Sequence, residues 1–321
     1  MLKVLVTGGA GFIGSHLVDQ LVLAGHDVTV LDALTTGRIV NLADSMPSVR
    51  FRCGSILDRP LVDALVSDAD VVFHLAAAVG VRNILASPVD SIIVNTHGTE
   101  NVLLSCRDHW KRVVIASSSE IYGRTGKIPM REDDDRVLGP PDVHRWSYST
   151  AKALDEHLAF GLATEGVPVS IVRYFNTYGP RMAPHGYGSV VANLFRQAMA
   201  GEPMTVHGDG LQTRSFTYVA DTARGTAAAG FHDAAVGTAV NLGNAREITI
   251  LNLAELVRAE VGGSSEIVLT THESYYGKGF DETLRRVPDI GRARDTLGWE
   301  PTIDLAEGLA STYRWLLGNG G

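Results

Sequence analysis

The chain has 321 residues, of which 45% are hydrophobic, so one large α/β domain with an appended lobe or two modest domains can form, and wholesale disorder is excluded. The formal net charge is −8 and basic runs are missing, so we expect no nucleic-acid partner. Cys53 and Cys106 lack the CxxC spacing of metal and disulfide scaffolds, which predicts no metal site and favours a reducing, cytoplasmic location.

The first half of the chain alternates short apolar runs with helical patterns. It enters the first run without the residue order of a signal peptide, and no stretch approaches the roughly 18 apolar residues that suggest a membrane span. Strands alternating with helices predict an α/β fold with a doubly wound parallel (Rossmann) sheet. The expected strands are 3–7, 27–32, 49–53, 71–75, 112–117 and 169–175, and the expected helices include 14–24, with Gly25 as a C-cap, and 88–109.

The pattern changes after about residue 176. Gly, Pro and His become frequent, and short helices alternate with isolated strands such as 204–207. The segment 271–288 has little periodicity, so we expect it to be irregular and to cover a ligand. We therefore predict a Rossmann domain at 1–176, with some later returns of the chain to it, and a smaller mixed lobe at 177–321 that mainly binds substrate.

A glycine-rich turn follows the first strand and opens the first helix. Its sequence is GGAGFIG, and the three spaced glycines allow a tight turn, close approach of a pyrophosphate and close packing of helix on sheet. This strand–turn–helix context predicts dinucleotide binding, and the alternative is a tight turn that binds no nucleotide. The expected cofactor contacts in this turn are Gly8, Gly11, Phe12, Ile13 and Gly14.

Further cofactor contacts are expected where the next strands end. Asp32 can accept hydrogen bonds from the adenosine ribose and repel a 2′-phosphate, which favours NAD over NADP, although Arg38 nearby tempers that preference. Asp58 follows the third strand and either meets the adenine amine or caps the next helix. Leu75 and Ala76 end the fourth strand and let a dinucleotide lie close.

Tyr148 and Lys152 are spaced to share one face of a helix. The pKa of a tyrosine phenol is about 10, and we expect the neighbouring ammonium to bring the pKa of Tyr148 toward working pH. A phenolate can then take the hydroxyl proton of an alcohol that a dinucleotide oxidises. By itself this spacing often occurs by chance on exposed helices, but after a nucleotide-binding turn it is specific.

Three motifs together resemble the extended short-chain dehydrogenase/reductase family, whose members mostly modify nucleotide-diphosphate sugars. They are the glycine turn, SSSEIYG at 117–123 and YSTAK at 148–152. The resemblance covers essentially the whole chain, including NTYGPR and GDGLQTRSFTYV in its second half. It implies that Tyr148 is the catalytic base, that Lys152 holds the nicotinamide ribose, and that Ser118 helps bind the reacting oxygen.

Two features resemble UDP-glucuronate decarboxylases in particular. Glu120 lies in SSEIYG, where many 4-epimerases have a small or apolar residue, and Ser119 stands where 4,6-dehydratases have the aspartate that expels the 6-hydroxyl. The segment 275–290 is similar to UDP-apiose/UDP-xylose synthases and to the decarboxylase domain of the lipid A aminoarabinose pathway, although Phe280 replaces a tyrosine of the latter. In those enzymes an arginine matching Arg286 faces the sugar carboxylate.

The resemblance thus implies an NAD-dependent enzyme that oxidises C4 of a UDP-hexuronate and releases carbon dioxide, with Glu120 and Arg286 as further catalytic residues. A UDP-glucose or UDP-glucuronate 4-epimerase is the alternative enzyme, because the same base and cofactor serve both reactions. A structural salt bridge is the alternative reading of the Glu120 and Arg286 pair. The intact set of Ser118, Tyr148 and Lys152 argues against a non-catalytic dinucleotide sensor.

The resemblance also implies partners. We expect a UDP-sugar substrate and a homodimer formed through the helices at about 88–109 and 148–165, although the apolar residues of those helices could face only the sheet. The expected substrate contacts are Ser119, Asn176, Arg181 and Arg214. Arginine suits the diphosphate because its guanidinium offers paired donors.

Overall fold

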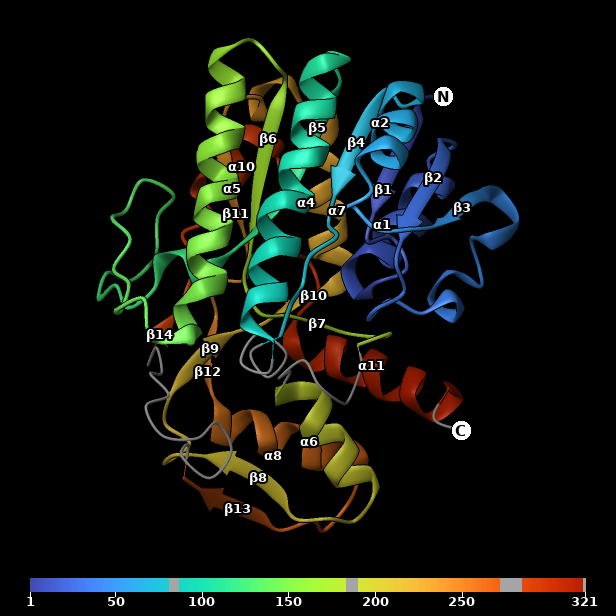
Figure 1. Cartoon of the computed structure of the whole chain (residues 1–321). Helices are drawn as coiled ribbons and strands as arrows, with labels where there is room; N and C mark the ends of the chain where they lie inside the picture. The colour runs from blue at the N-terminus through green and yellow to red at the C-terminus, as the bar shows by residue number, and fades with distance from the viewer. Residues whose placement is uncertain (81–86, 183–189, 272–284, 320–321) are drawn as a thin grey trace.

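A seven-stranded parallel sheet forms the larger part of the molecule (Figure 1), as seen in a computed structural model that describes residues 1–80, 87–182, 190–271 and 285–319. The strand order β11-β6-β5-β4-β1-β2-β3 places the reversal of the winding between β1 and β4. The strands are β1 (Lys3–Thr7), β2 (Asp27–Asp32), β3 (Val49–Cys53), β4 (Val71–His74), β5 (Arg112–Ser118), β6 (Val169–Tyr174) and β11 (Ala239–Leu242). The doubly wound prediction is confirmed, and each expected strand matches to within one residue at its ends.

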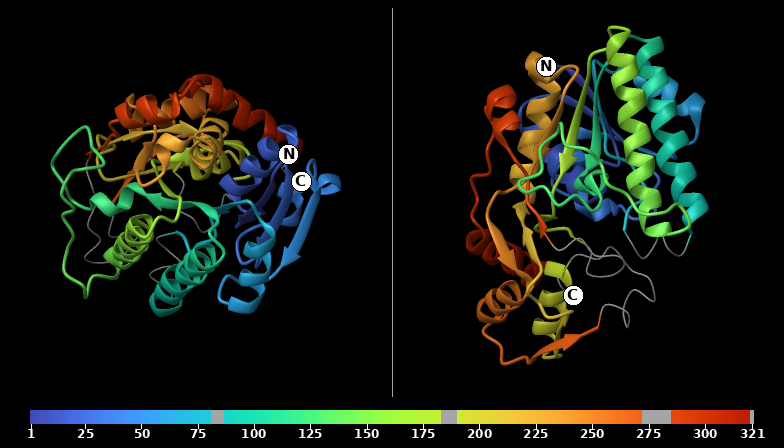
Figure 2. Two further views of the ribbon diagram at one scale, coloured as in Figure 1. Left: turned by 90° about the horizontal axis from the view of Figure 1, so that it is seen from above. Right: turned by 90° about the vertical axis from the view of Figure 1, so that its left-hand side faces the viewer.

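Helices cover both faces of this sheet (Figures 1 and 2). One face carries α1 (Phe12–Leu23), α7 (Val219–Phe231) and α10 (Gly291–Leu297), and the other carries α2 (Arg59–Asp68), α4 (Pro88–Asp108) and α5 (Ser147–Thr164). Ala24 is the C-cap of α1, one residue before the expected Gly25. Gly25 follows it with a positive φ of 79° and donates its N–H to the Val22 carbonyl. None of the helices within the described ranges combines the length and the apolar character that crossing a membrane requires.

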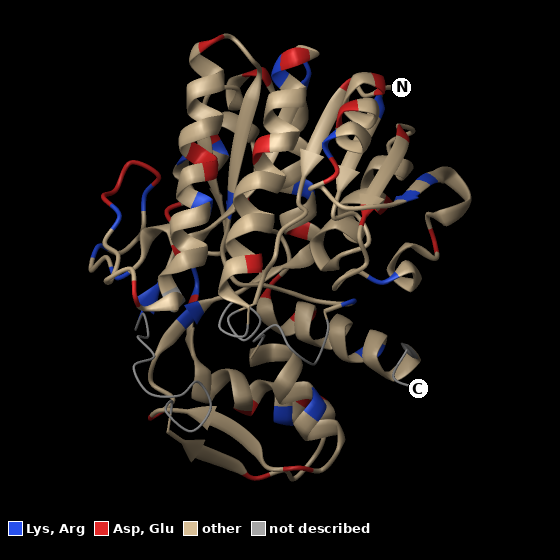
Figure 3. Ribbon diagram, in the orientation of Figure 1, with Lys and Arg blue, Asp and Glu red and all other residues tan. Residues whose placement is uncertain are grey.

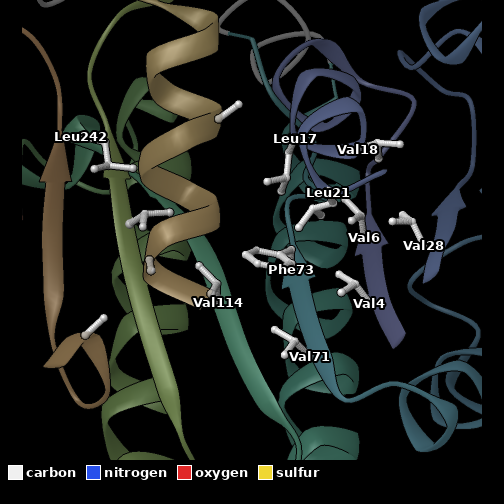
Figure 4. Close-up of a cluster of buried hydrophobic side chains, with 14 of the residues drawn as sticks. Val4, Val6, Leu17, Val18, Leu21, Val28, Val71, Phe73, Val114 and Leu242 are labelled. Atoms are coloured by element: carbon white, nitrogen blue, oxygen red, sulfur yellow. The ribbon is translucent and has the colours of Figure 1, made fainter. Parts of the chain in front are cut away.

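The core forms because successive strand residues point to opposite faces. Val4 and Val6 pack with Phe73 under Leu17 and Leu21 of α1 (Figure 4). Leu5, between the two valines, belongs instead to the second buried cluster, beneath α2, α4 and α5. The alternation fixes which side of each strand end faces which helix, and thereby places the residues that follow the strands.

The second half of the chain builds smaller sheets beside the main one. The pairs are β7 (Thr177–Tyr178) with β10 (Thr217–Tyr218), β8 (Met204–His207) with β13 (Ile267–Thr270), and β9 (Thr213–Ser215) with both β12 (Glu247–Thr249) and β14 (Arg285–Arg286). Their helices are α6 (Val190–Met199), α8 (Ile250–Val261) and α11 (Leu305–Asn319). Short 3-10 turns lie at Ile39–Leu42, Met46–Ser48, Ser119–Tyr122 (η3), His144–Trp146 and Asp233–Ala235.

The predicted returns of the chain to the Rossmann sheet are present, since α7, β11 and α10 all follow residue 176. The smaller sheets with α6 and α8 share a separate buried cluster, which includes Leu194, Phe195 and Leu253. The exact division at 176 stays a prediction. Most of the segment expected to be irregular, including Phe280, lies outside the described residues.

Candidate functional site

The glycine turn packs against the end of β4 with no room for side chains. A Cβ on Gly8 would lie 2.7 Å from the Ala76 nitrogen, and one on Gly14 would lie 2.1 Å from the Gly8 carbonyl oxygen. Gly8 also has a positive φ of 73°. Leu75 donates its N–H to the Thr7 carbonyl. The glycine turn at 8–14 and the end of β4 at Leu75 and Ala76 therefore fit tightly together, and we call this surface the cofactor wall.

Helix α1 opens toward this wall with its first-turn N–H groups. Gly11 is the N-cap, and no side chain of the described residues caps the helix. The N–H groups of Phe12, Ile13 and Gly14 have no acceptor within the helix, because the first turn never does. Such a helix end binds anions such as a pyrophosphate.

Asp32 lies at the end of β2 with only 7% of its surface exposed. Its two oxygens accept the N–H groups of Ala10 (2.9 Å) and Leu34 (2.8 Å). A carboxylate has about four lone-pair sites, so capacity remains for two ribose hydroxyls. The Asn41 amide donates to the Ala10 carbonyl at 2.9 Å, a support for the turn that the sequence analysis missed.

Asp58 caps helix α2, because its Oδ1 accepts the Leu61 N–H at 3.2 Å. The helix-capping alternative of the sequence analysis is thus confirmed. A contact between Asp58 and an adenine amine stays a prediction.

Tyr148 and Ser118 meet where β5 ends and α5 begins. The Ser118 hydroxyl forms a hydrogen bond with the Tyr148 phenol, and its oxygen accepts the Glu120 N–H at 3.2 Å. Ser149 donates to the Glu120 carbonyl at 2.7 Å and so fastens α5 to η3. The two expected catalytic hydroxyls are therefore in contact.

Burial raises the pKa of Tyr148 above its ordinary value, and the negative charges of Glu120 and Asp155 add to that rise. Lys152 and the hydrogen bond from Ser118 act in the opposite direction and are outweighed. The expectation that the ammonium brings the pKa of Tyr148 toward working pH is therefore wrong for this structure. The physical reason is desolvation, which penalises the phenolate more than one ammonium favours it.

Lys152 forms an ion pair with a carboxylate that the sequence analysis did not single out. Its Nζ lies 3.1 Å from Asp155 Oδ2, and both side chains are 3% exposed. Burial lowers the pKa of Lys152, but the charges of Asp155 and Tyr148 reverse this, so that the net shift is upward. Lys152 therefore stays an ammonium beside Tyr148.

Glu120 and Arg286 form an ion pair across the two parts of the molecule. The Arg286 guanidinium on β14 donates to Glu120 Oε1 on η3 at 2.7 Å, and the two side chains are 9% and 17% exposed. Arg286 pairs in register with Arg214 of β9, so two arginines lie side by side in this small sheet, whose basic residues Figure 3 colours blue. The structure thus joins two candidate residues that are 166 positions apart.

The remaining substrate candidates are each anchored to the protein. The Asn176 amide donates to the Ser215 carbonyl at 3.1 Å, and Arg214 donates to the Thr213 carbonyl at 2.8 Å. Ser119 is 3% exposed at the start of η3. The substrate contacts of these three residues stay predictions.

Arg181 pairs with acids on the α1 side of the molecule. Its guanidinium lies 2.6 Å from Asp19 and 3.4 Å from Asp44. These ion pairs give Arg181 a structural role, and its predicted contact with substrate stays untested.

Comparison with known proteins agrees with this geometry. The profile of the GDP-mannose 4,6 dehydratase family matches residues 5–312. A UDP-N-acetyl-alpha-D-glucosaminuronate decarboxylase of Bacillus cytotoxicus is 40% identical over 98% of this chain and 97% of its own length. UDP-glucuronic acid decarboxylase 1 of Xenopus tropicalis is 37% identical over 98% of this chain and 72% of its own length.

The solved structure of Thermus thermophilus UDP-glucose 4-epimerase in complex with NAD superposes with a TM-score of 0.85. It is 29% identical and covers 99% of this chain and 100% of its own. These matches confirm the resemblance drawn from the motifs. The chain belongs to the GDP-mannose 4,6 dehydratase family of extended short-chain dehydrogenases/reductases.

Proposed function

We propose that the protein is an NAD-dependent decarboxylase of a UDP-hexuronate. The ion pair of Glu120 and Arg286 carries this proposal. A guanidinium offers five N–H donors in a fork that matches carboxylates, and among the described residues Glu120 is the one side chain that accepts from Arg286. The other donors suit the C6 carboxylate of a hexuronate, a group that UDP-glucose lacks.

The cofactor wall fits NAD. The glycine turn leaves no space for a Cβ, the N-terminus of α1 offers N–H groups to a pyrophosphate, and Asp32 keeps acceptor capacity for ribose hydroxyls. Asp32 also disfavours a 2′-phosphate, as in NADP. We assign the nicotinamide ribose to Lys152. When bound, NAD supplies the acceptor for the hydride that leaves C4 of the sugar.

Tyr148 and Ser118 carry the proton chemistry. In its phenolate form, a minor fraction at neutral pH because the pKa of Tyr148 is raised, Tyr148 takes the proton of the sugar 4-hydroxyl. C4 then becomes a ketone that lies β to the C6 carboxylate. The bond between C5 and C6 then breaks, carbon dioxide leaves, and its electron pair remains as an enolate. Ser118 and the reprotonated Tyr148 donate hydrogen bonds to the enolate oxygen. Arg286 or Glu120 manages the proton that returns to C5, which yields a UDP-4-keto-pentose or, after reduction, a UDP-pentose.

A 4-epimerase is the second candidate, because the UDP-glucose 4-epimerase of Thermus thermophilus superposes on this chain with a TM-score of 0.85. Epimerisation also needs Tyr148, but it releases no carbon dioxide from either UDP-glucose or UDP-glucuronate. Carbon dioxide release by the wild type therefore separates the two reactions, and the variants Glu120→Gln and Arg286→Ala test whether the ion pair takes part. We expect each to lower carbon dioxide release by about 10²-fold or more, the usual scale for losing one group that acts in the transition state.

The test is carbon dioxide release from UDP-glucuronate and from UDP-N-acetylglucosaminuronate, with Arg285→Ala as the matched control. Arg285 is the neighbouring arginine on β14, but it is exposed and pairs with Glu247. If Glu120→Gln and Arg286→Ala release carbon dioxide as fast as Arg285→Ala, the proposed role of the ion pair fails. If the wild type releases carbon dioxide from neither substrate, the decarboxylase proposal fails.

We further propose a homodimer in the cytoplasm. Helices α4 and α5 lie side by side on the outer face of the sheet (Figure 2). They carry large apolar side chains that are 36–66% exposed, namely Val89, Ile92, Ile93, Leu154 and Phe160. Such clustered exposed apolar residues are typical of an interface. The free thiols of Cys53 and Cys106 suit a reducing compartment.

A further inference from the structure

A chain of buried hydrogen bonds leads from Lys152 to the first strand of the sheet. Asp155 Oδ2 lies 3.1 Å from Lys152 Nζ and 3.2 Å from Thr99 Oγ1. His74 Nε2 lies 3.1 Å from Thr99 Oγ1, and His74 Nδ1 lies 2.7 Å from Thr7 Oγ1. The five side chains come from α5, α4, β4 and β1, and all are buried.

The donors in this chain all point toward Asp155. Thr7 accepts the Ala76 N–H at 3.3 Å and is free to donate its own proton to His74 Nδ1. Burial lowers the pKa of His74 to about 3, so its ring is neutral. We assign its single proton to Nε2, because the Thr99 hydroxyl donates elsewhere and can only accept from the ring. The Thr99 hydroxyl has one proton, whose nearer acceptor is the Asn95 carbonyl at 2.6 Å and whose second acceptor is Asp155 at 3.2 Å. The Asp155 carboxylate thus accepts hydrogen bonds both from Lys152 and from Thr99, the last donor of the hydrogen-bond chain.

At Thr7, the far end of the hydrogen-bond chain contacts the cofactor wall, because Thr7 accepts the Ala76 N–H. Ala76 is the residue whose backbone leaves no room for a Cβ on Gly8. Asn95, one turn before Thr99 on α4, holds the next part of this segment by accepting the Ala78 N–H at 2.7 Å and donating to its carbonyl at 2.9 Å. The same backbone that receives the glycine turn is therefore connected to the Lys152 ammonium.

We propose that Asp155 is a positioning residue for the reaction. Through its hydrogen bonds to Lys152 and Thr99, and from Thr99 to His74, it fixes the Lys152 ammonium relative to the cofactor wall. It also balances the positive charge of Lys152 beside Tyr148. The inference rests on the proposed roles of Tyr148 and Lys152. Asp155 itself touches neither expected ligand; it acts through Lys152.

The proposal predicts a change in pH dependence, because the charge of Asp155 acts on the pKa of the candidate base Tyr148. Among the residues that the structure describes, Lys152, Glu120, Asp155 and Tyr174 are the titratable groups that face Tyr148. His74 and Glu156 also face the ion pair of Lys152 and Asp155. The Asp155 charge raises the pKa of both Tyr148 and Lys152. Asp155→Asn removes that charge and keeps an oxygen that accepts from Lys152, so both pKa values fall.

The experiment measures NADH formation in a single turnover as a function of pH, with the nucleotide sugar that the wild type oxidises. For Asp155→Asn we expect the acidic limb to move to lower pH by about one unit, the usual scale for removing one nearby charge. Thr99→Val breaks the chain without changing a charge, and we expect a rate about tenfold lower, the scale of one hydrogen bond to a charged group.

Thr96→Val is the matched control for Thr99→Val. Both threonines lie on α4 and donate to the carbonyl four residues earlier, but Thr96 does not belong to the hydrogen-bond chain from Thr7 to Asp155. A wild-type pH profile in folded Asp155→Asn, or equal rates in Thr99→Val and Thr96→Val, overturns the inference. If Asp155→Asn does not fold, the threonine pair alone decides. Retained turnover in Tyr148→Phe instead overturns the proposed function, so the two failures are distinguishable.

Discussion

At the scale of single residues, the candidate base is a partly buried phenol between charges of both signs. Lys152 and Ser118 favour the phenolate, whereas burial, Glu120 and Asp155 favour the phenol. The net result is a raised pKa, so Tyr148 is protonated over the neutral range. A protonated phenol is suited to donate to a developing oxyanion, and proton removal becomes easier as the pH rises.

Replacing Tyr148 by Phe tests the base directly. We expect Tyr148→Phe to lower the rate of NAD reduction by about 10²- to 10⁴-fold, the usual contribution of general-base catalysis. The NAD dissociation constant should change little, because the cofactor wall is built from other residues. Stopped-flow absorbance gives the rate and titration calorimetry gives the affinity. Retained turnover would show that another group is the base.

The ionisation of Tyr148 can be followed without any substrate. Ultraviolet difference spectroscopy between the wild type and Tyr148→Phe isolates this phenol. Because its pKa is raised from 10.0, we expect no phenolate signal in the neutral range, and Glu120→Gln should move the signal to lower pH. A Tyr148 phenolate near neutral pH contradicts the account.

The sequence predicted the chemical identity of the site better than its electrostatics. The motifs identified Ser118, Tyr148, Glu120 and Arg286, and the structure brings Tyr148 to Ser118 and Glu120 to Arg286. The direction of the Tyr148 pKa shift was missed because burial cannot be read from an i,i+4 spacing. Asp155 was missed because an acid three residues after a lysine usually marks a solvated helix face.

At the scale of elements, η3 is held in place by a buried network. The Arg173 guanidinium of β6 donates to Glu156 of α5 at 3.0 and 2.7 Å and to the Tyr122 hydroxyl at 2.8 Å. Tyr122 in turn donates to Asn241 of β11 at 2.7 Å. These contacts fix the turn that carries Glu120 and therefore the geometry of its pair with Arg286.

The close fit of the glycine turn leads to a prediction for two matched glycine substitutions. In Gly14→Ala the new Cβ would lie 2.1 Å from the Gly8 carbonyl oxygen, so we expect the turn to shift and NAD affinity to fall by at least about tenfold. Gly161 on α5 has open space around it. Gly161→Ala should keep NAD affinity and stabilise the protein by about 0.5–1 kcal/mol.

Calorimetric titration with NAD and urea unfolding provide the two measurements. Equal NAD affinity in Gly14→Ala and the wild type would show that the turn does not receive the cofactor.

The main strands were predictable because each is a continuous apolar run. The three-stranded sheet with β9, β12 and β14 was not, since its strands are two or three residues long and come together across distant parts of the chain.

At the scale of the whole molecule, the proposed site depends on how the two parts meet. Glu120 follows a strand of the main sheet, whereas Arg286 belongs to the smaller sheet of the second half. A substrate carboxylate at this junction would contact both parts. The doubly wound sheet follows from sequence periodicity, but this junction depends on long-range pairing that periodicity does not encode.

The proposed homodimer can be tested with one charge on its expected face. Leu154 on α5 is 55% exposed, and we expect Leu154→Asp to shift the protein from dimer to monomer in analytical ultracentrifugation, because a buried unpaired charge is costly. Leu23 on α1 is 86% exposed on the opposite side of the sheet. Leu23→Asp should leave the dimer intact, and equal behaviour of both variants argues against this interface.

The most direct test of the central claim is the mass of the nucleotide sugar after incubation with the purified protein and NAD. UDP-glucuronate and UDP-N-acetylglucosaminuronate are supplied in parallel. We predict that at least one yields a product lighter by the mass of carbon dioxide, and that free NADH absorbance distinguishes ketone release from reduction. An unchanged mass with a changed sugar NMR spectrum would contradict the decarboxylase and identify a 4-epimerase instead.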